Sequence, residues 1–207
     1  DFSGNNRHFT AFGTSSPNTQ GIYKTNQQNS LPGIQFTHDA NSATTTNTRY
    51  DTPSAFYSAY TESEVFVVLK TTNDPQTSNL VGCWGKFGSD SLTVHYNFNG
   101  DSSIYESFGS TARKNSGNPT PTLTNFNNYN IATKANSFIT RLNGTQHYST
   151  TTNTVGWTSS GRFGGQASSD DDSGYSGVIL EIIWFSRVLN SSERSLLNTY
   201  ISAKYSI

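Results

Sequence analysis

The C-terminal stretch GVILEIIWFSRVLNSSERSLLNTYISAKYSI (177–207) carries the strongest structural signal in the chain. Its first part, residues 177–189, is the most apolar run of the sequence, which indicates a buried β-strand. The second part, residues 191–205, has side chains at helical spacing: Leu196, Leu197, Tyr200, Ile201 and Lys204. We therefore predict a strand followed by one closing helix, with Ser191 or Ser192 as the N-cap.

Shorter apolar runs precede this stretch, and turn residues separate them. The clearest strand is EVFVVLK (64–70), which is β-branched and aromatic and stops at TTNDP (71–75). Two further runs are NLVGCWGKF (79–87) and SLTVHYNF (91–98). Because only GSD (88–90) lies between them, we predict that they form a hairpin.

The middle of the chain continues this pattern of strands and turns. One short strand is predicted at SIYESF (103–108). Two strands around Asn136 are predicted in residues 131–150, and the pair Asn143-Gly144 is a type I′ hairpin signal. Many short strands with a single helix predict an all-β protein, built as two antiparallel sheets packed face to face.

The order of several motifs adds a resemblance. The C-terminal strand contains Gly177 and Glu181, and Arg187 and Leu189 follow it. Other segments in order are DFSGNNRHF (1–9), LPGIQF (31–36), EVFVVLK (64–70), RLNGT (141–145) and RFGGQ (162–166). Together these motifs resemble laminin-G-like, concanavalin A-like jelly-roll domains of the lectin and glucanase type.

The resemblance implies a single domain over residues 1–207, folded as an antiparallel jelly-roll β-sandwich with one short C-terminal helix. It also implies a glycan-binding or adhesion module of an extracellular, cell-surface or virion protein, such as a phage tail or head fibre or a secreted bacterial adhesin. Related domains have a strand before the position of Asp1, and this chain contains no Met. We therefore expect a fragment of a larger protein, with other domains or copies of a parent assembly as partners.

The composition excludes several classes of function. Ser, Thr and Asn account for 80 of 207 residues, while the formal net charge is only −1. A protein that binds nucleic acid through phosphate neutralisation needs a basic surplus, which is missing. No segment approaches the roughly 18 consecutive apolar residues that indicate a membrane span. A neutral polar surface instead favours neutral glycans as partners, without nucleic acid and without membrane insertion.

Four aromatic residues are candidates for stacking on sugar rings: Trp84, Tyr96, Tyr105 and Trp157. Each also has a packing alternative. Trp84 lies in an apolar run and Tyr96 on the apolar face of its segment, so both suit a protein core. Trp157 lies in the loop-like segment TVGWTSSG, where ligand contact and packing at the core's rim are both open.

One acidic cluster could bind a metal ion. Asp170, Asp171 and Asp172 are adjacent, and Ser168, Ser169 and Ser173 flank them. Carboxylate and hydroxyl oxygens suit Ca²⁺, so a calcium site is one interpretation. Consecutive residues of an extended segment point to opposite sides, so a solvated loop is the alternative.

Few acids are available for glycoside hydrolysis, which needs two carboxylates across a cleft. Glu62 and Glu64 are two residues apart and share a strand face, but they lie at the start of a predicted strand. Glu106 stands alone in its strand, and Glu181 matches a structural position in the closing strand of the resembling domains. The sequence therefore favours a non-catalytic binding module. Two alternatives remain open, which are a structural decoration or spacer domain and a polysaccharide hydrolase or lyase.

Overall fold

The computed structural model describes residues 4, 7–11, 20–38, 48–53, 56–78, 81–166 and 173–207. These residues form mostly β-strands and one C-terminal helix, α1 (Ser191–Tyr205). The strands are β1 (Thr10–Ala11), β2 (Ile22–Gln28), β3 (Leu31–Phe36), β4 (Tyr50–Asp51), β5 (Glu62–Thr71), β6 (Gly85–Gly88), β7 (Ile104–Glu106), β8 (Lys114–Gly117), β9 (Asn127–Lys134), β10 (Ser137–Leu142), β11 (Thr145–Thr150), β12 (Trp157–Phe163) and β13 (Gly177–Phe185).

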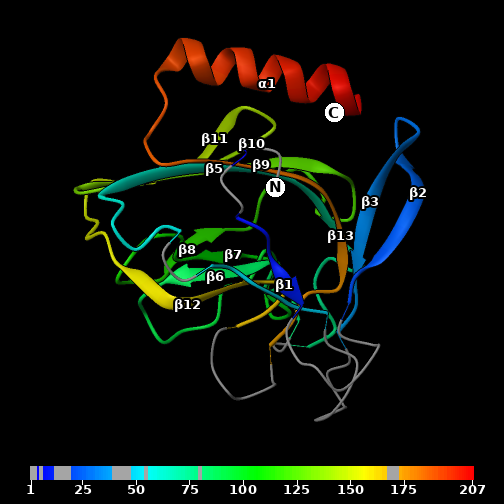
Figure 1. The fold of residues 1–207 in the computed structure, drawn as a ribbon, viewed down its shortest axis with the longest axis horizontal. Coiled ribbons are helices and arrows are strands. Elements are labelled where there is room, and N and C mark those ends of the chain that lie inside the picture. The colour runs from blue at the N-terminus through cyan, green and yellow to red at the C-terminus, as the bar shows by residue number, and fades with distance from the viewer. Residues whose placement is uncertain are drawn as a thin grey trace.

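The strands assemble into sheets in which neighbours run antiparallel. The largest has seven strands in the order β11-β10-β9-β5-β13-β3-β2. A second has four strands, β1-β4-β12-β6, and β7 pairs with β8. In Figure 1, α1 lies above the seven-stranded sheet, while β6 and β12 lie below it. The prediction of a mostly β protein with antiparallel sheets and one C-terminal helix is confirmed.

Strand β5 shows how the sequence divides the interior into two parts. Its Val65, Val67 and Leu69 side chains belong to the main core, which also contains Phe87 of β6 and Phe163 of β12. This core therefore lies between the seven-stranded and four-stranded sheets. The alternate residues of β5 point the other way, because successive side chains of a strand face opposite sides.

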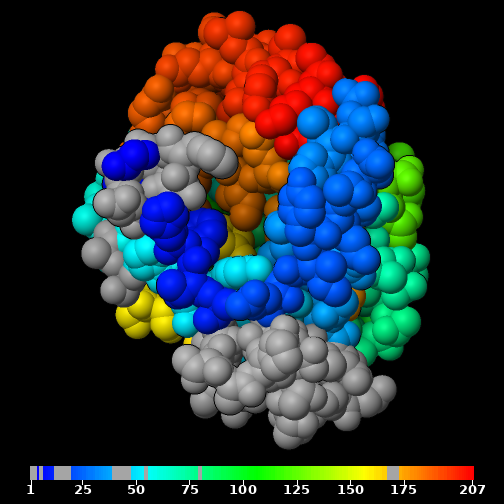
Figure 2. All heavy atoms as spheres, turned by 45° about the vertical axis from the view of Figure 1, so that its right-hand side comes forward, coloured from blue at the N-terminus to red at the C-terminus, as the bar shows by residue number. Residues whose placement is uncertain are grey.

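The opposite face of the seven-stranded sheet packs against α1. Phe66 and Val68 of β5 form a second apolar cluster with Ile201 and Tyr205 of the helix. At its C-terminal end, α1 also meets the turn between β2 and β3, where the side-chain amide Nε2 of Gln28 donates to the Tyr205 backbone carbonyl at 2.8 Å. Figure 2 shows this hairpin reaching the end of the helix.

The helix begins one residue earlier than a Ser191 cap implies and two residues earlier than a Ser192 cap implies. Asn190 is the N-cap, and its Oδ1 accepts a hydrogen bond from the Glu193 amide at 2.9 Å. The Glu193 carboxylate in turn accepts from the Asn190 amide at 2.9 Å, which completes a capping box. The prediction of Ser191 or Ser192 as N-cap is wrong, because only a cap at Asn190 places a Glu at the third helical position.

The predicted hairpin of residues 79–87 and 91–98 does not form. In the described parts of these two segments, residues 81–87 and 91–98, β6 is the only strand, and residues 91–98 contribute an isolated bridge between His95 and Tyr105. The Tyr96 amide donates to the Gly82 carbonyl at 2.8 Å. Both His95 and Tyr96 are buried, so the apparent alternation of an exposed and a covered face is absent. Contacts on both sides of this segment therefore replace the hairpin pairing.

The Asn-Gly turn is as predicted. β10 and β11 are joined by Asn143 and Gly144, whose φ values are +50° and +79°. A type I′ turn needs positive φ at both central residues, and Asn and Gly adopt it most readily. The predicted strands of residues 131–150 are also present as the end of β9, β10 and β11, with Asn136 in the β9–β10 turn.

Candidate functional site

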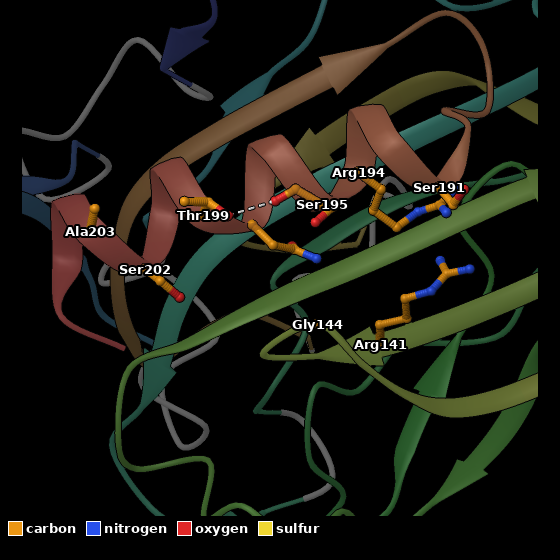
Figure 3. A pocket seen from close by; sticks show the side chains of 9 residues that line it. Arg141, Gly144, Ser191, Arg194, Ser195, Thr199, Ser202 and Ala203 are labelled. Carbon is orange, nitrogen blue, oxygen red and sulfur yellow. Dashed lines mark hydrogen bonds between the residues drawn. The ribbon is translucent and has the colours of Figure 1, made fainter.

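A polar groove runs along one side of α1. It has a volume of about 800 Å³ and is lined by Arg141, Gly144, Ser191, Arg194, Ser195, Asn198, Thr199, Ser202 and Ala203. We call it the α1 groove (Figure 3). Its helical residues span from Ser191 to Ala203, a length of about 18 Å at 1.5 Å per residue. The groove is thus long, shallow and rich in hydroxyl, amide and guanidinium groups.

Strand β10 supplies the other wall of the groove, because its side chains alternate between the two faces of the sheet. Phe138 and Leu142 point into the main core, so Arg141 lies on the opposite face, beside the helix. The turn after β10 brings Gly144 close to α1. A Cβ atom at this position would lie 3.2 Å from the Asn198 amide nitrogen. Gly144 therefore supports both the turn and the close approach of the hairpin to the helix.

A chain of asparagine amides forms one end of the groove. Asn128 Nδ2 donates to Asn198 Oδ1 at 3.0 Å, and the Asn128 backbone amide donates to Asn143 Oδ1 at 2.8 Å. Asn143 Nδ2 then donates to Asn127 Oδ1 at 2.8 Å. Asn127 and Asn143 also line a second pocket of about 480 Å³ at the C-terminal end of the helix. These amides therefore connect two neighbouring polar hollows.

A buried carboxylate holds the helix against the sheet at the other end of the groove. The Glu64 side chain is 0% exposed, and Arg194 binds it with two hydrogen bonds of 2.7 and 3.0 Å. The Leu189 amide and the Asn130 side chain donate to it at 2.8 and 2.9 Å. Arg141 lies 3.9 Å from the same carboxylate. Both oxygens of the buried Glu64 carboxylate therefore accept hydrogen bonds from protein groups.

Two of the four predicted stacking residues are core residues. Trp84 and Tyr96 are both 0% exposed. The Trp84 indole N–H donates to Glu106 Oε2 at 2.9 Å, and Tyr96 packs on Tyr129 with ring centroids 5.1 Å apart. Their candidate role in glycan binding is corrected to core packing, because neither ring has a face that a ligand can reach.

The other two predicted residues are partly buried, and protein groups cover them. The Arg113 guanidinium lies 4.7 Å from the centre of the Tyr105 ring, and Phe98 packs against that ring at 5.5 Å. Trp157 donates its indole N–H to the Tyr60 carbonyl at 2.7 Å and packs beside the main core. None of the four predicted aromatic residues lines the α1 groove.

The remaining acids named from the sequence also have structural partners. Glu181 accepts hydrogen bonds from Lys204 and Tyr200 of α1 at 2.9 and 3.2 Å. Glu62 accepts one from the Val188 amide at 3.3 Å. Glu106 is 1% exposed and lies within the core. No pair of these acids lines the α1 groove or either of the two other described pockets.

The predicted calcium ligands Asp170, Asp171 and Asp172 lie outside the described residues. Among the residues that the structure does describe, no group of three or more His, Cys, Asp or Glu side chains is placed to hold a metal ion. The calcium site stays a prediction. Cys83 is buried, and burial raises the pKa of its thiol to about 12.

None of the groove residues was predicted from the sequence to contact a ligand. One signal could have indicated them. Ser191, Arg194, Ser195, Asn198 and Ser202 recur at helical spacing and form a polar stripe along one side of α1. Such a stripe usually faces solvent, so its significance depends on Arg141 and the Asn143-Gly144 turn lying next to it. Only the tertiary structure reveals that proximity.

Comparisons with known proteins extend these observations. No protein-family model and no curated protein matches the chain. The binding domain of Paraclostridial Mosquitocidal Protein 1 is 12% identical with a TM-score of 0.60, covering 97% of this chain and 49% of that chain. Domain 4 of AbnA, a GH43 extracellular arabinanase from Geobacillus stearothermophilus solved with arabinotriose, is 12% identical with a TM-score of 0.54, covering 86% and 81%.

A third similar structure is the binding domain of Botulinum neurotoxin DC in complex with SialylT. It is 12% identical with a TM-score of 0.53, covering 88% of this chain and 45% of that chain. This chain thus spans about half the length of the toxin binding domains. At these identities the likeness establishes a shared fold. In the described part of the chain, no helix is both long and apolar enough to span a membrane.

Proposed function

We propose that this chain is a non-catalytic carbohydrate-binding module whose ligand lies in the α1 groove. The observation that carries the proposal is the lining of the groove. Hydroxyl, amide and guanidinium groups along about 18 Å of helix offer hydrogen bonds to a row of sugar hydroxyls. Recognition would rest on these hydrogen bonds rather than on the aromatic stacking that the sequence suggested.

The structural neighbours support this class of ligand unequally. The toxin complex with SialylT supports it weakly, because this chain matches only 45% of that chain. The arabinanase domain supports it better, because 81% of a domain solved with arabinotriose is matched. A bound oligosaccharide on a related fold supports an elongated oligosaccharide as the occupant of the groove.

The proposal includes the absence of catalysis. Hydrolysis of a glycosidic bond requires two carboxyl groups that reach the same bond. Glu64 and Glu106 are buried and hydrogen-bonded, and Glu181 is paired with Lys204. Within the described residues, the groove itself contains no acid. Binding therefore fits the available side chains better than hydrolysis does.

The wider context of the proposal comes from the sequence. We propose a jelly-roll β-sandwich of the laminin-G-like type, part of a larger extracellular, cell-surface or virion protein. Single sites of this kind bind weakly and gain avidity when many copies are arrayed. A calcium ion at Asp170, Asp171 and Asp172 could add to binding. A purely structural spacer domain is the second candidate.

A glycan array tests the proposal. The chain is applied alone and in a multimerised form, with and without a calcium chelator. We expect binding to oligosaccharides, stronger in the multimer; loss with chelator would assign a role to the aspartate loop. Absence of any signal from either form would favour the spacer interpretation.

Two matched serine variants place the ligand. Ser195 lines the groove, whereas Ser192 lies on the same exposed helix outside it. Ser195→Ala should weaken binding about fivefold, the effect of losing one hydrogen bond. Ser192→Ala should leave affinity unchanged. Equal effects of the two substitutions would move the ligand away from the α1 groove.

A further inference from the structure

Two guanidinium groups face the buried Glu64 carboxylate beside the N-terminal end of α1. Arg194 pairs with this carboxylate through two hydrogen bonds. Arg141 approaches the same carboxylate only to 3.9 Å. The nearby pair of Arg187 and Glu193 is neutral overall. Among the described residues, Arg141 therefore forms no hydrogen bond with a carboxylate of its own.

Most N–H groups of the Arg141 guanidinium form no hydrogen bond within the described part of the protein. Its Nη1 donates to Asn130 Oδ1 at 2.9 Å, and a guanidinium carries five N–H groups. Among the described residues, no other acceptor is hydrogen-bonded to Arg141. Its side chain is 12% exposed, and it lines the groove. The remaining N–H groups are therefore available to a ligand in this part of the groove.

The surroundings make the second positive charge unfavourable. Burial lowers the pKa of Arg141 from its usual value, and the charge of Arg194 lowers it further, while Glu64 acts in the opposite direction. An anion placed beside Arg141 would relieve this repulsion. A guanidinium binds a carboxylate with two parallel hydrogen bonds, an arrangement that a neutral sugar hydroxyl cannot reproduce.

The neutral part of the groove continues from this point along the helix. Figure 3 shows Arg141 extending from β10 toward the end of α1 that carries Ser191 and Arg194. Ser195 and Asn198 follow one and two turns further on. A ligand with one carboxylate at its end and hydroxyl groups along its body would match this order of donors.

We propose that the ligand of the α1 groove is an acidic saccharide whose carboxylate binds Arg141. This proposal rests on the proposed function and specifies the class of sugar. Sialic acids and uronic acids share the required carboxylate on a polyhydroxylated ring. The neutral groups of the groove hold the rest of the sugar, and the charge of Arg141 selects it.

Two matched pairs of sugars test the proposal by calorimetric titration of the wild-type chain. The first pair is sialyllactose and lactose, and the second is a galacturonate oligosaccharide and its methyl ester. We expect the acidic member of at least one pair to bind about tenfold more tightly than its neutral partner, as a charge-assisted hydrogen bond requires. Raising the ionic strength should reduce this preference.

Substitution of Arg141 identifies its role. Arg141→Gln should abolish the preference for the acidic sugar while weak binding of the neutral sugar remains. The control is Lys134→Gln on the neighbouring strand β9, which removes one positive charge from an exposed position outside the groove. It should keep the preference. Circular dichroism and urea unfolding establish that both variants are folded.

The outcomes separate the two proposals. Equal binding of the acidic and neutral members of both pairs would overturn the acidic ligand and leave the carbohydrate-binding function standing. A preference that survives Arg141→Gln, or that Lys134→Gln also abolishes, would equally overturn the role of Arg141. If no sugar binds the wild-type chain, both proposals fail.

Discussion

The buried acid Glu106 gives a prediction about stability and pH. Its carboxyl accepts hydrogen bonds from the Trp84 indole at 2.9 Å, the Tyr129 hydroxyl at 3.2 Å and the amides of Ser107 and Phe108 at 2.9 and 3.0 Å. Burial nevertheless raises the pKa of Glu106 from 4.5 to about 7, because desolvation exceeds the effect of these four donors. The perturbation that tests this balance is Glu106→Gln.

The magnitude follows from the two pKa values. The folded state keeps a proton on Glu106 between pH 4.5 and about 7, where the unfolded state has lost it. The contribution to stability is therefore full below pH 4.5 and is lost as the pH rises through about 7. The difference between the ordinary pKa of 4.5 and the folded-state pKa of about 7 corresponds to about 3 kcal/mol of unfolding free energy.

His95 has the opposite effect over nearly the same range. It is 4% exposed, and burial lowers its pKa from 6.5 to about 4. The unfolded state binds a proton there that the folded state does not, so stability is lost as the pH falls from 6.5 through about 4. The shifted pKa of His95 therefore also changes the free energy of unfolding by about 3 kcal/mol across this pH range. With respect to these two groups, the stability of the wild-type chain should be nearly independent of pH between 4.5 and 6.5.

Glu106→Gln removes the pH-dependent contribution of Glu106 to stability and leaves the opposite contribution of His95. The free energy of unfolding of the variant should then rise by up to about 3 kcal/mol as the pH increases from 4.5 to 6.5. His95→Gln should give the reverse slope. The assay is urea unfolding at a series of pH values for all three proteins. Parallel profiles for the wild-type chain and Glu106→Gln would refute the buried, protonated Glu106.

Three further predictions concern the elements that build the groove. Arg194→Ala leaves the Glu64 charge buried without its bidentate partner, so unfolding free energy should fall by about 3 kcal/mol; a smaller loss in urea unfolding would mean that Arg141 takes over the pairing. Asn190→Ala removes the helix cap and should cost about 1 kcal/mol in the same assay, with an unchanged result arguing against the capping box. Gly144→Ala places a side chain at a φ of +79° and close to Asn198, so it should lower stability by about 1 kcal/mol or more, visible as a lower thermal midpoint.

Local sequence patterns predicted the elements that depend on neighbouring residues. The spacing of apolar residues in 191–205 is sufficient for α1, and the β-branched run at 64–70 is sufficient for the centre of β5. The Asn143-Gly144 turn needs only two residues that tolerate positive φ. Each of these elements expresses a preference of the local backbone, so no distant contact is required to predict it.

The same reasoning failed where distant segments decide the outcome. Residues 91–98 alternate like a strand, but the isolated bridge of His95 to Tyr105 and a bond to Gly82 hold them instead. The burial of individual aromatic residues could not be predicted either, because the sequence does not reveal that Trp84 and Tyr96 are covered on every side. An aromatic ring suits a core and a sugar site equally well, so residue type alone could not separate the two.

The sequence by itself determined that this protein is mostly β with one closing helix, since period and turn chemistry are properties of short segments. It also determined the neutral polar character that favours sugars over phosphates, since composition sets the surface chemistry. Only the tertiary structure placed Arg141 beside Arg194 and a single Glu64. These residues are far apart along the chain, and their electrostatic balance exists only after β5, β10 and α1 have packed together.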